Sequence, residues 1–167
     1  MSRWRIAQVN VAKLTRPLDD PRIDDFRNAL ERINRLGEAQ PGFVWRAQGA
    51  GFDATDCRVF DDPDILINAT VWETVEHLAA FAYRTEHREF VRRRLEWFEA
   101  PAEPFQAIWW VPDGHIPSLD ECVERLTHIR AYGPTAFAFD FRTRFPAPSE
   151  VSDPVSEEVA APMRAVP

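Results

Sequence analysis

The stretch Val71–Phe98, VWETVEHLAAFAYRTEHREFVRRRLEWF, decides the fold because it changes from the period of a strand to the period of a helix. It closes an alternating segment, residues 66–72, and continues as two amphipathic helical segments. His87 stands at the start of the second helical segment. The positions that share its helix face are mostly apolar: Phe90, Val91, Arg94, Leu95 and Phe98. We therefore expect His87 to face the interior of the protein.

The other elements follow from hydrophobic periodicity and from the turn residues between the periodic segments. We expect strands at residues 4–13, 42–49, 66–72 and 104–112, and helices at residues 21–36, 73–84, 86–99 and 118–131. Residues 136–141, AFAFDF, are interpreted as a short edge strand. The C-terminal segment is rich in Pro, Ala, Ser and Glu without a periodic apolar face. This pattern predicts a domain over residues 1–143 and a tail over residues 144–167.

The order βαββααβ is typical of a ferredoxin-like α+β sandwich, an antiparallel sheet with helices on one face. Trp109 and Trp110 are adjacent in the fourth strand and therefore point to opposite faces of the sheet. Both faces thus carry large apolar side chains, and the face without helices needs a cover. A second copy of the chain is the simplest cover, so we expect a homodimer.

Composition excludes several classes of partner. The chain has 20 Lys and Arg against 27 Asp and Glu, a formal net charge of −7. So acidic a chain is repelled by nucleic acid and by anionic membrane surfaces, and we expect it to bind neither. Its two cysteines, Cys57 and Cys122, form no metal-ligand spacing and are expected to be reduced. No signal peptide or membrane span is evident, which predicts a cytoplasmic protein.

Val71–Phe98, together with WWVPDGHIPS at residues 109–118 and the pair Gly133-Pro134, resembles a bacterial family catalogued as domain of unknown function 3291. His87, about fifteen residues after Trp72, is also similar in position to a histidine of the dimeric α+β barrel superfamily. That superfamily includes antibiotic-biosynthesis monooxygenases, haem-degrading monooxygenases, isomerases and dehydratases. The resemblance implies a dimeric fold with a pocket between sheet and helices, but not one reaction, because this fold serves many.

His87 is the first candidate for catalysis. An imidazole titrates near neutral pH and can accept or donate a proton or bind a metal. Tyr83, four residues earlier, lies near it if the helix extends back. The alternative is a structural histidine whose nitrogens bond a backbone carbonyl and a neighbouring side chain. His115, in a turn before the helix at residues 118–131, is a second acid/base candidate if the fourth strand ends at the pocket mouth.

Polar side chains on the strands are the second group of candidates. They fall on alternate positions of the first, third and fourth strands, which are neighbours in this fold: Gln8, Asn10, Asn68, Thr70 and Gln106. On one face they would form a polar patch that satisfies itself, contacts a dimer partner or binds a ligand. We expect Asn10 or Asn68 to orient a carbonyl or phenol oxygen.

The resemblance to haem-degrading enzymes adds one cofactor candidate. In those enzymes an asparagine on the first strand, an aromatic residue on the second helix and a helical histidine make the site. Asn10, Phe81 and His87 are the nearest equivalents here, although Phe81 stands where those enzymes have a tryptophan and the spacing is shorter. No organic cofactor is expected, and haem is the alternative.

These observations lead to one leading hypothesis and two alternatives. The leading hypothesis is a small-molecule enzyme of monooxygenase, isomerase or cyclase type, with His87 as general acid/base and a planar apolar or aromatic substrate. Residues expected to bind the substrate are Trp72, Phe81, Tyr83, Arg94, Trp109 and Trp110. The alternatives are a haem protein with His87 as axial ligand and a dimeric ligand-binding protein without catalysis.

Overall fold

Four antiparallel strands form one sheet in the order β2-β3-β1-β4. The computed structural model describes residues 3–50, 53–57 and 60–148. The central strand, β1 (Trp4–Lys13), pairs with β3 (Ile65–Trp72) on one side and with β4 (Gln106–Pro112) on the other. The short strand β2 (Phe43–Arg46) lies at the edge against β3. This is the strand order of a ferredoxin-like sheet, and the predicted fold class is confirmed.

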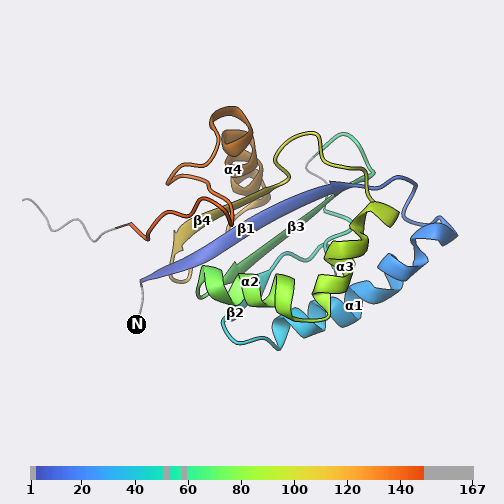
Figure 1. Ribbon diagram of the computed structural model, residues 1–167, viewed down its shortest axis with the longest axis horizontal. Coiled ribbons are helices and arrows are strands. Elements are labelled where there is room, and N and C mark those ends of the chain that lie inside the picture. Colours follow the sequence, from blue (N-terminus) through green and yellow to red (C-terminus); the bar gives the residue numbers. More distant parts are fainter. Residues whose placement is uncertain (1–2, 51–52, 58–59, 149–167) are drawn as a thin grey trace, which may run out of the picture.

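Three helices lie on one face of the sheet, as Figure 1 shows: α1 (Asp24–Glu38), α2 (Val75–Arg84) and α3 (His87–Arg93). Short 3-10 turns precede α1 (Pro21–Ile23) and follow α3 (Arg94–Glu96). The predicted cap at Asp20 is present, since its carboxylate accepts a hydrogen bond from the Arg22 backbone N–H. The segment expected to be one helix over residues 86–99 is therefore α3 followed by a tighter turn.

The last helix, α4 (Leu119–Tyr132), differs in position from the prediction because it packs on the opposite face of the sheet (Figure 1). Its buried residues Cys122, Leu126 and Ile129 form one apolar cluster with the odd-numbered residues of β1, Ala7, Val9 and Val11. The sheet face that was expected to be bare is thus covered by the chain itself. The expectation of a second copy on this face loses its physical basis.

Trp109 belongs to this second face and is fully buried under α4. Its indole N–H donates a hydrogen bond to Glu121 Oε1 at 2.9 Å. The Ser118 hydroxyl accepts from the Glu121 backbone N–H at 3.1 Å, which is half of the predicted capping box. The Glu121 carboxylate joins the helix to the sheet instead of reaching back to complete the box.

The predicted edge strand at residues 136–141 is reduced to a single antiparallel bridge between Phe139 and Ile108. The two residues exchange backbone hydrogen bonds of 2.8 Å in both directions. Further along, the Phe145 carbonyl accepts from the Trp110 indole N–H at 2.8 Å. Most of the predicted tail, residues 149–167, lies outside the described residues.

In the described part of the chain, every helix is too short or too polar to cross a membrane.

The packing of α4 on the sheet leads to a stability test. We expect Leu126→Ala to lower the free energy of unfolding by about 2–5 kcal/mol, because Leu126 is 1% exposed in the cluster between α4 and the sheet. The matched control is Glu124→Ala on the same helix, where the side chain is exposed and the change is expected to be within about 0.5 kcal/mol. Urea unfolding measures both, and equal effects would contradict this packing.

Candidate functional site

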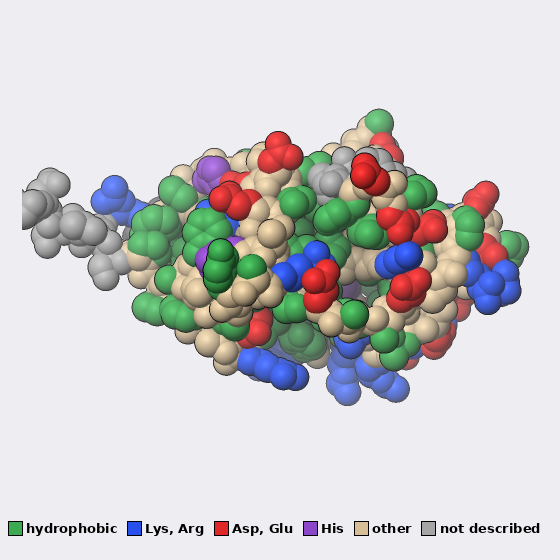
Figure 2. Space-filling model, turned by 90° about the horizontal axis from the view of Figure 1, so that it is seen from above, with side chains coloured by type: hydrophobic (Ala, Val, Ile, Leu, Met, Phe, Trp, Pro, Cys, Tyr) green, Lys and Arg blue, Asp and Glu red, His purple; other side chains and the backbone are tan. Residues whose placement is uncertain are grey.

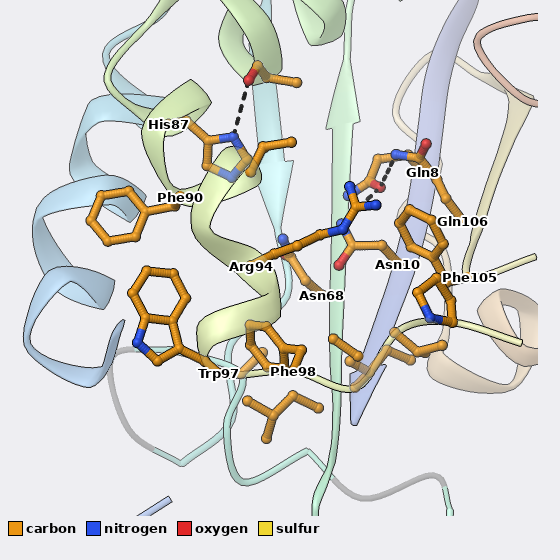
Figure 3. Close-up of a pocket in the computed structure, with 18 of the residues that line it drawn as sticks. Gln8, Asn10, Asn68, His87, Phe90, Arg94, Trp97, Phe98, Phe105 and Gln106 are labelled. Atoms are coloured by element: carbon orange, nitrogen blue, oxygen red, sulfur yellow. Dashed lines mark hydrogen bonds between the residues drawn. The ribbon is translucent and has the colours of Figure 1, made fainter. Parts of the chain in front are cut away.

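A cavity of about 530 Å³ lies between the sheet and the helices α1, α2 and α3. Its volume is in the range that holds a drug-sized molecule. The floor is formed by the even-numbered positions of β1 and β3, and the walls come from α1, α3 and the segment that follows α3. Figure 3 shows side chains from these elements converging on the same space.

The floor of the cavity is polar. The strand register places Asn10 opposite Asn68 on one side and opposite Gln106 on the other. Gln8 lies opposite Thr70, and its Nε2 donates a hydrogen bond to the Thr70 hydroxyl oxygen at 3.0 Å. The expected polar patch is therefore present on one face of the sheet, and it faces the three helices.

Gln8 is the centre of this amide network. Its Oε1 accepts from Asn10 Nδ2 and from Gln106 Nε2, both at 3.4 Å. The Asn68 side chain, by contrast, is exposed to the cavity and makes no hydrogen bond with any residue that the structure describes. The patch is therefore satisfied at its buried centre and leaves the amide of Asn68 available to a ligand.

A break between α2 and α3 positions His87. Thr85 has extended backbone angles, φ −108° and ψ −176°, so α2 stops and α3 starts in a new direction. The Thr85 hydroxyl donates to the Phe81 carbonyl at 2.7 Å and accepts from the His87 backbone N–H at 3.2 Å. The helix does not extend back from His87, so Tyr83 is not its neighbour. Tyr83 lies on the cavity lining instead, with its ring edge-on to Phe141 at 5.5 Å.

The His87 ring is oriented by one hydrogen bond and one ring contact. Nδ1 lies 3.3 Å from the Ala82 carbonyl oxygen, which can only accept, so Nδ1 carries the proton in the neutral ring. Nε2 then has a free lone pair and points away from Ala82 into the space between helices and sheet (Figure 3). Burial lowers the pKa of His87 below its ordinary value of 6.5, and the hydrogen bond to Ala82 offsets this in part.

Phe81 holds the other side of the imidazole. The two ring centroids are 4.6 Å apart, and Phe81 is in turn stacked on Trp72 at 5.3 Å. Gly37 of α1 makes room for Phe81, because a Cβ atom there would lie 3.2 Å from the Phe81 ring. Trp72 itself lines a side cavity of about 40 Å³ and not the main one. His87 and Asn68 line both cavities, so they lie where the two cavities meet.

Aromatic residues that were not among the expected site residues form the wall beside His87. Phe90 is stacked on Trp97 at 5.8 Å, and Phe26 of α1 meets Phe98 edge-on at 5.0 Å. All four line the cavity. The helical spacing after His87 had placed Phe90 and Phe98 on its face, but Trp97 follows the 3-10 turn and leaves that periodicity.

Three of the expected site residues lie away from the cavity, and these expectations are corrected. Trp109 is on the α4 face of the sheet. Trp110 packs with Phe139 and Phe145 beyond the cavity. The His115 side chain is 42% exposed, and its Nε2 lies 2.7 Å from Glu121 Oε2 near α4. The alternation of side chains along a strand predicts that Trp109 and Trp110 point to opposite faces of the sheet. It does not predict which face holds the cavity.

The remaining expected residues do come together. Those on the lining of the main cavity are Asn10, Asn68, Phe81, Tyr83, His87 and Arg94. Within the described ranges, no three His, Cys, Asp or Glu side chains are grouped to hold a metal ion. A haem iron needs only one imidazole, and the unprotonated Nε2 of His87 beside aromatic walls fits an axial ligand.

Comparison with solved structures finds small proteins of low sequence identity. SnoaB, a cofactor-independent oxygenase from Streptomyces nogalater, is 13% identical, with 68% of this chain and 98% of that chain covered and a TM-score of 0.46. A conserved protein from Methanosarcina mazei is 14% identical, covering 66% and 93% of the two chains at a TM-score of 0.45. PA3566 from Pseudomonas aeruginosa is 11% identical, covering 66% and 95% at 0.43.

No curated protein matches the sequence. The model of one family, described as domain of unknown function DUF3291, matches residues 5–154. That range includes the sheet except Trp4, the helices α1 to α4 and every side chain named on the cavity. The chain belongs to the DUF3291 family, as the resemblance of its helical motifs implied.

Proposed function

We propose that the protein is a small-molecule enzyme that removes a proton next to the carbonyl group of a planar, largely apolar substrate bound in the cavity. The observation that carries this proposal is the state of His87. Its Nδ1–H is directed to the Ala82 carbonyl, and its Nε2 lone pair faces the cavity at neutral charge. A general base needs this protonation state at the working pH.

The first step transfers one proton from carbon to nitrogen. Nε2 of His87 accepts the proton, and the electron pair of the C–H bond becomes part of an enolate whose negative charge lies on the former carbonyl oxygen. Asn68 then donates its Nδ2–H to that oxygen. One such donor, aimed at a developing oxyanion in a site shielded from water, contributes about 3 kcal/mol of transition-state stabilisation.

The walls favour a flat substrate. Phe90 and Phe98 present aromatic surface on the side of the helices, with the buried Trp97 stacked on Phe90, and the amide floor lies opposite them. A planar ring system placed between these layers keeps its faces against apolar groups and its oxygen atoms against donors. Phe81 is the proposed contact at the His87 end, with Trp72 acting through Phe81, and Tyr83 is a proposed contact on the α2 side of the lining.

An enolate is a shared intermediate of three reactions. Reprotonation at another carbon gives an isomerase, attack on a second carbonyl gives a cyclase, and reaction with dioxygen gives an oxygenase. The residues of the cavity support the shared first step, and the fate of the enolate depends on the substrate.

The pKa of His87 can be measured directly. We expect NMR titration of its ring protons to give a midpoint below 6.5, and a midpoint near 6.5 for the urea-unfolded chain. As the pH falls, His87 is then protonated in the unfolded state at a higher pH than in the folded state. The free energy of unfolding therefore decreases as the pH drops below 6.5, and His87→Gln removes this part of its pH dependence. A folded-state midpoint at or above 6.5 would contradict the proposed base.

Proton removal can be followed with 2-tetralone, a flat bicyclic ketone. We expect the protein to catalyse deuterium exchange at C1 of 2-tetralone in D₂O, and His87→Gln to slow it at least about 100-fold because the base is lost. Proton NMR of the ketone measures the rate. The matched control is His115→Gln, which removes a histidine outside the cavity and should leave the rate unchanged.

Deuterium exchange that is equally fast in the His87→Gln variant would refute the proposed base.

Addition of hemin tests the alternative function, haem binding. A one-to-one Soret band that disappears in His87→Ala would favour haem binding, with His87 as axial ligand.

We also propose that the chain is a homodimer, and a surface other than the covered sheet face supports this. Ile116, Tyr132 and Phe137 are 46%, 75% and 38% exposed around α4. Figure 2 looks onto the side of the molecule where α4 lies, and hydrophobic side chains are exposed there among charged and polar ones. Burial of such a patch between two copies would remove apolar surface from water.

Light scattering after size exclusion tests the dimer. We expect a mass of twice 19.3 kDa for the natural chain, and one chain mass for Tyr132→Glu, because a charge in the centre of the contact is desolvated. A single-chain mass for the unmodified protein would refute the dimer.

A further inference from the structure

Arg94 is a cation on the cavity wall at the end of α3. It lines the cavity, and its guanidinium lies over the ring of Phe105, 5.6 Å from the centroid. Figure 3 shows the side chain extending away from the helix toward the side of the cavity where Gln8, Asn10 and Gln106 lie. Arg94 therefore crosses the cavity from the helices toward the amide floor.

The other cations of the lining are neutralised by carboxylates. Lys13 lies 3.1 Å from Asp62 and 3.9 Å from Glu99. Arg130 pairs with Glu103 at 3.1 Å and donates to the Pro104 carbonyl at 2.9 Å. The two glutamates on the cavity lining, Glu99 and Glu103, are therefore each paired with one of these cations.

Arg94 differs from its sequence neighbours as well. Arg92 pairs with Glu89 at 3.2 Å, and Arg93 pairs with Glu96 at 2.8 Å and with Asp25 at 2.9 Å. Arg94 forms no ion pair with any residue in the described ranges. The remaining acid of the lining, Asp53, is held in its own loop by Thr55, whose backbone N–H and hydroxyl donate to Oδ1 at 2.9 and 2.6 Å.

The groups around Arg94 suit one kind of ligand atom. A guanidinium offers parallel N–H donors in a plane, which matches the two oxygens of a carboxylate. Asn10 and Gln106 each use one N–H toward Gln8 and keep a second amide hydrogen for another acceptor. The cation–π contact with Phe105 holds the guanidinium near this wall.

We propose that this end of the cavity is a carboxylate subsite, and that the natural substrate is a planar aromatic acid. This inference rests on the proposed function only for the placement of the reacting carbon at His87. Arg94 and the second amide hydrogens of Asn10 and Gln106 bind the carboxylate. The ring system then extends from this anchor along the aromatic wall to the imidazole.

Binding of an acid and its neutral ester tests the subsite. The probes are naphthalene-2-carboxylate and methyl naphthalene-2-carboxylate, which have the same ring system and differ in charge, and calorimetry gives both affinities. We expect the natural chain to prefer the acid. Arg94→Gln should weaken acid binding by roughly 10- to 100-fold and ester binding by less than about twofold. Arg94→Lys should restore only part of the acid preference, because a lysine lacks the planar pair of donors.

Arg88→Gln is the matched control. It removes the same charge from α3, before the 3-10 turn that holds Arg94, at an exposed position that does not line the cavity, and it should leave both affinities unchanged. If the natural chain binds acid and ester equally, or does not bind the acid at millimolar concentration, the carboxylate subsite is wrong. The same conclusion follows if Arg94→Gln and Arg88→Gln weaken acid binding equally.

The two proposals fail separately. Exchange of the neutral probe 2-tetralone depends on His87 and not on Arg94, whereas the acid preference depends on Arg94 and should persist in His87→Gln. Loss of the acid preference alone refutes the subsite and leaves the base intact. Exchange without a requirement for His87 refutes the base and leaves the subsite intact.

Discussion

The register of β1 between β3 and β4 is the constraint on which the site depends. Because side chains alternate along a strand, Ala7, Val9 and Val11 give one face of β1 an apolar centre, and it packs with α4. The other face carries Gln8 and Asn10, which the register sets beside the polar residues of β3 and β4. A slip of one residue would bring these amides under α4 and the apolar side chains to the cavity.

The polarity of the cavity floor, the amide-bearing face of the sheet, also explains why a cavity remains between the sheet and the helices. Helices close tightly on apolar sheet surface, as α4 does, but an amide floor offers little apolar area for such contact. The network around Gln8 satisfies the buried amides, so the fold tolerates them. The helices α1 and α2 contact the sheet at β2 and β3, and the space that remains has an aromatic wall opposite hydrogen-bond donors.

Much of this arrangement could be predicted from the sequence, since it depends on local periodicity. Alternation at residues 4–13 and 66–72 predicted the strands and the shared polar face, and helical spacing placed His87 and Arg94 on one inward face. The position of α4 could not be predicted, because an amphipathic helix shows which of its own sides is apolar but not which sheet face it meets. For the same reason, the sequence did not show which of Trp109 and Trp110 faces the cavity, and both were expected to bind the substrate.

The break at Thr85 agrees with the two helical segments expected at residues 73–84 and 86–99, but spacing did not show the change of direction between them. A continuous helix would place Tyr83 beside His87, but the Thr85 hydroxyl bonds the end of one helix and the start of the next. The role of the Thr85 hydroxyl was not predicted, because a threonine two residues before a histidine is a weak cap signal. The break makes Phe81 the neighbour of the imidazole and lets the Ala82 carbonyl fix its tautomer.

The central claim is that the His87 imidazole faces an open chamber that binds a flat ligand between aromatic wall and amide floor. The most direct measurement is a crystal structure of the chain soaked with 2-tetralone. We expect density for the ketone in the cavity of about 530 Å³, with its oxygen within hydrogen-bond distance of Asn68 and C1 facing His87 Nε2. A chamber filled by the protein's own side chains, or a ketone bound elsewhere with His87 turned away, would contradict the account.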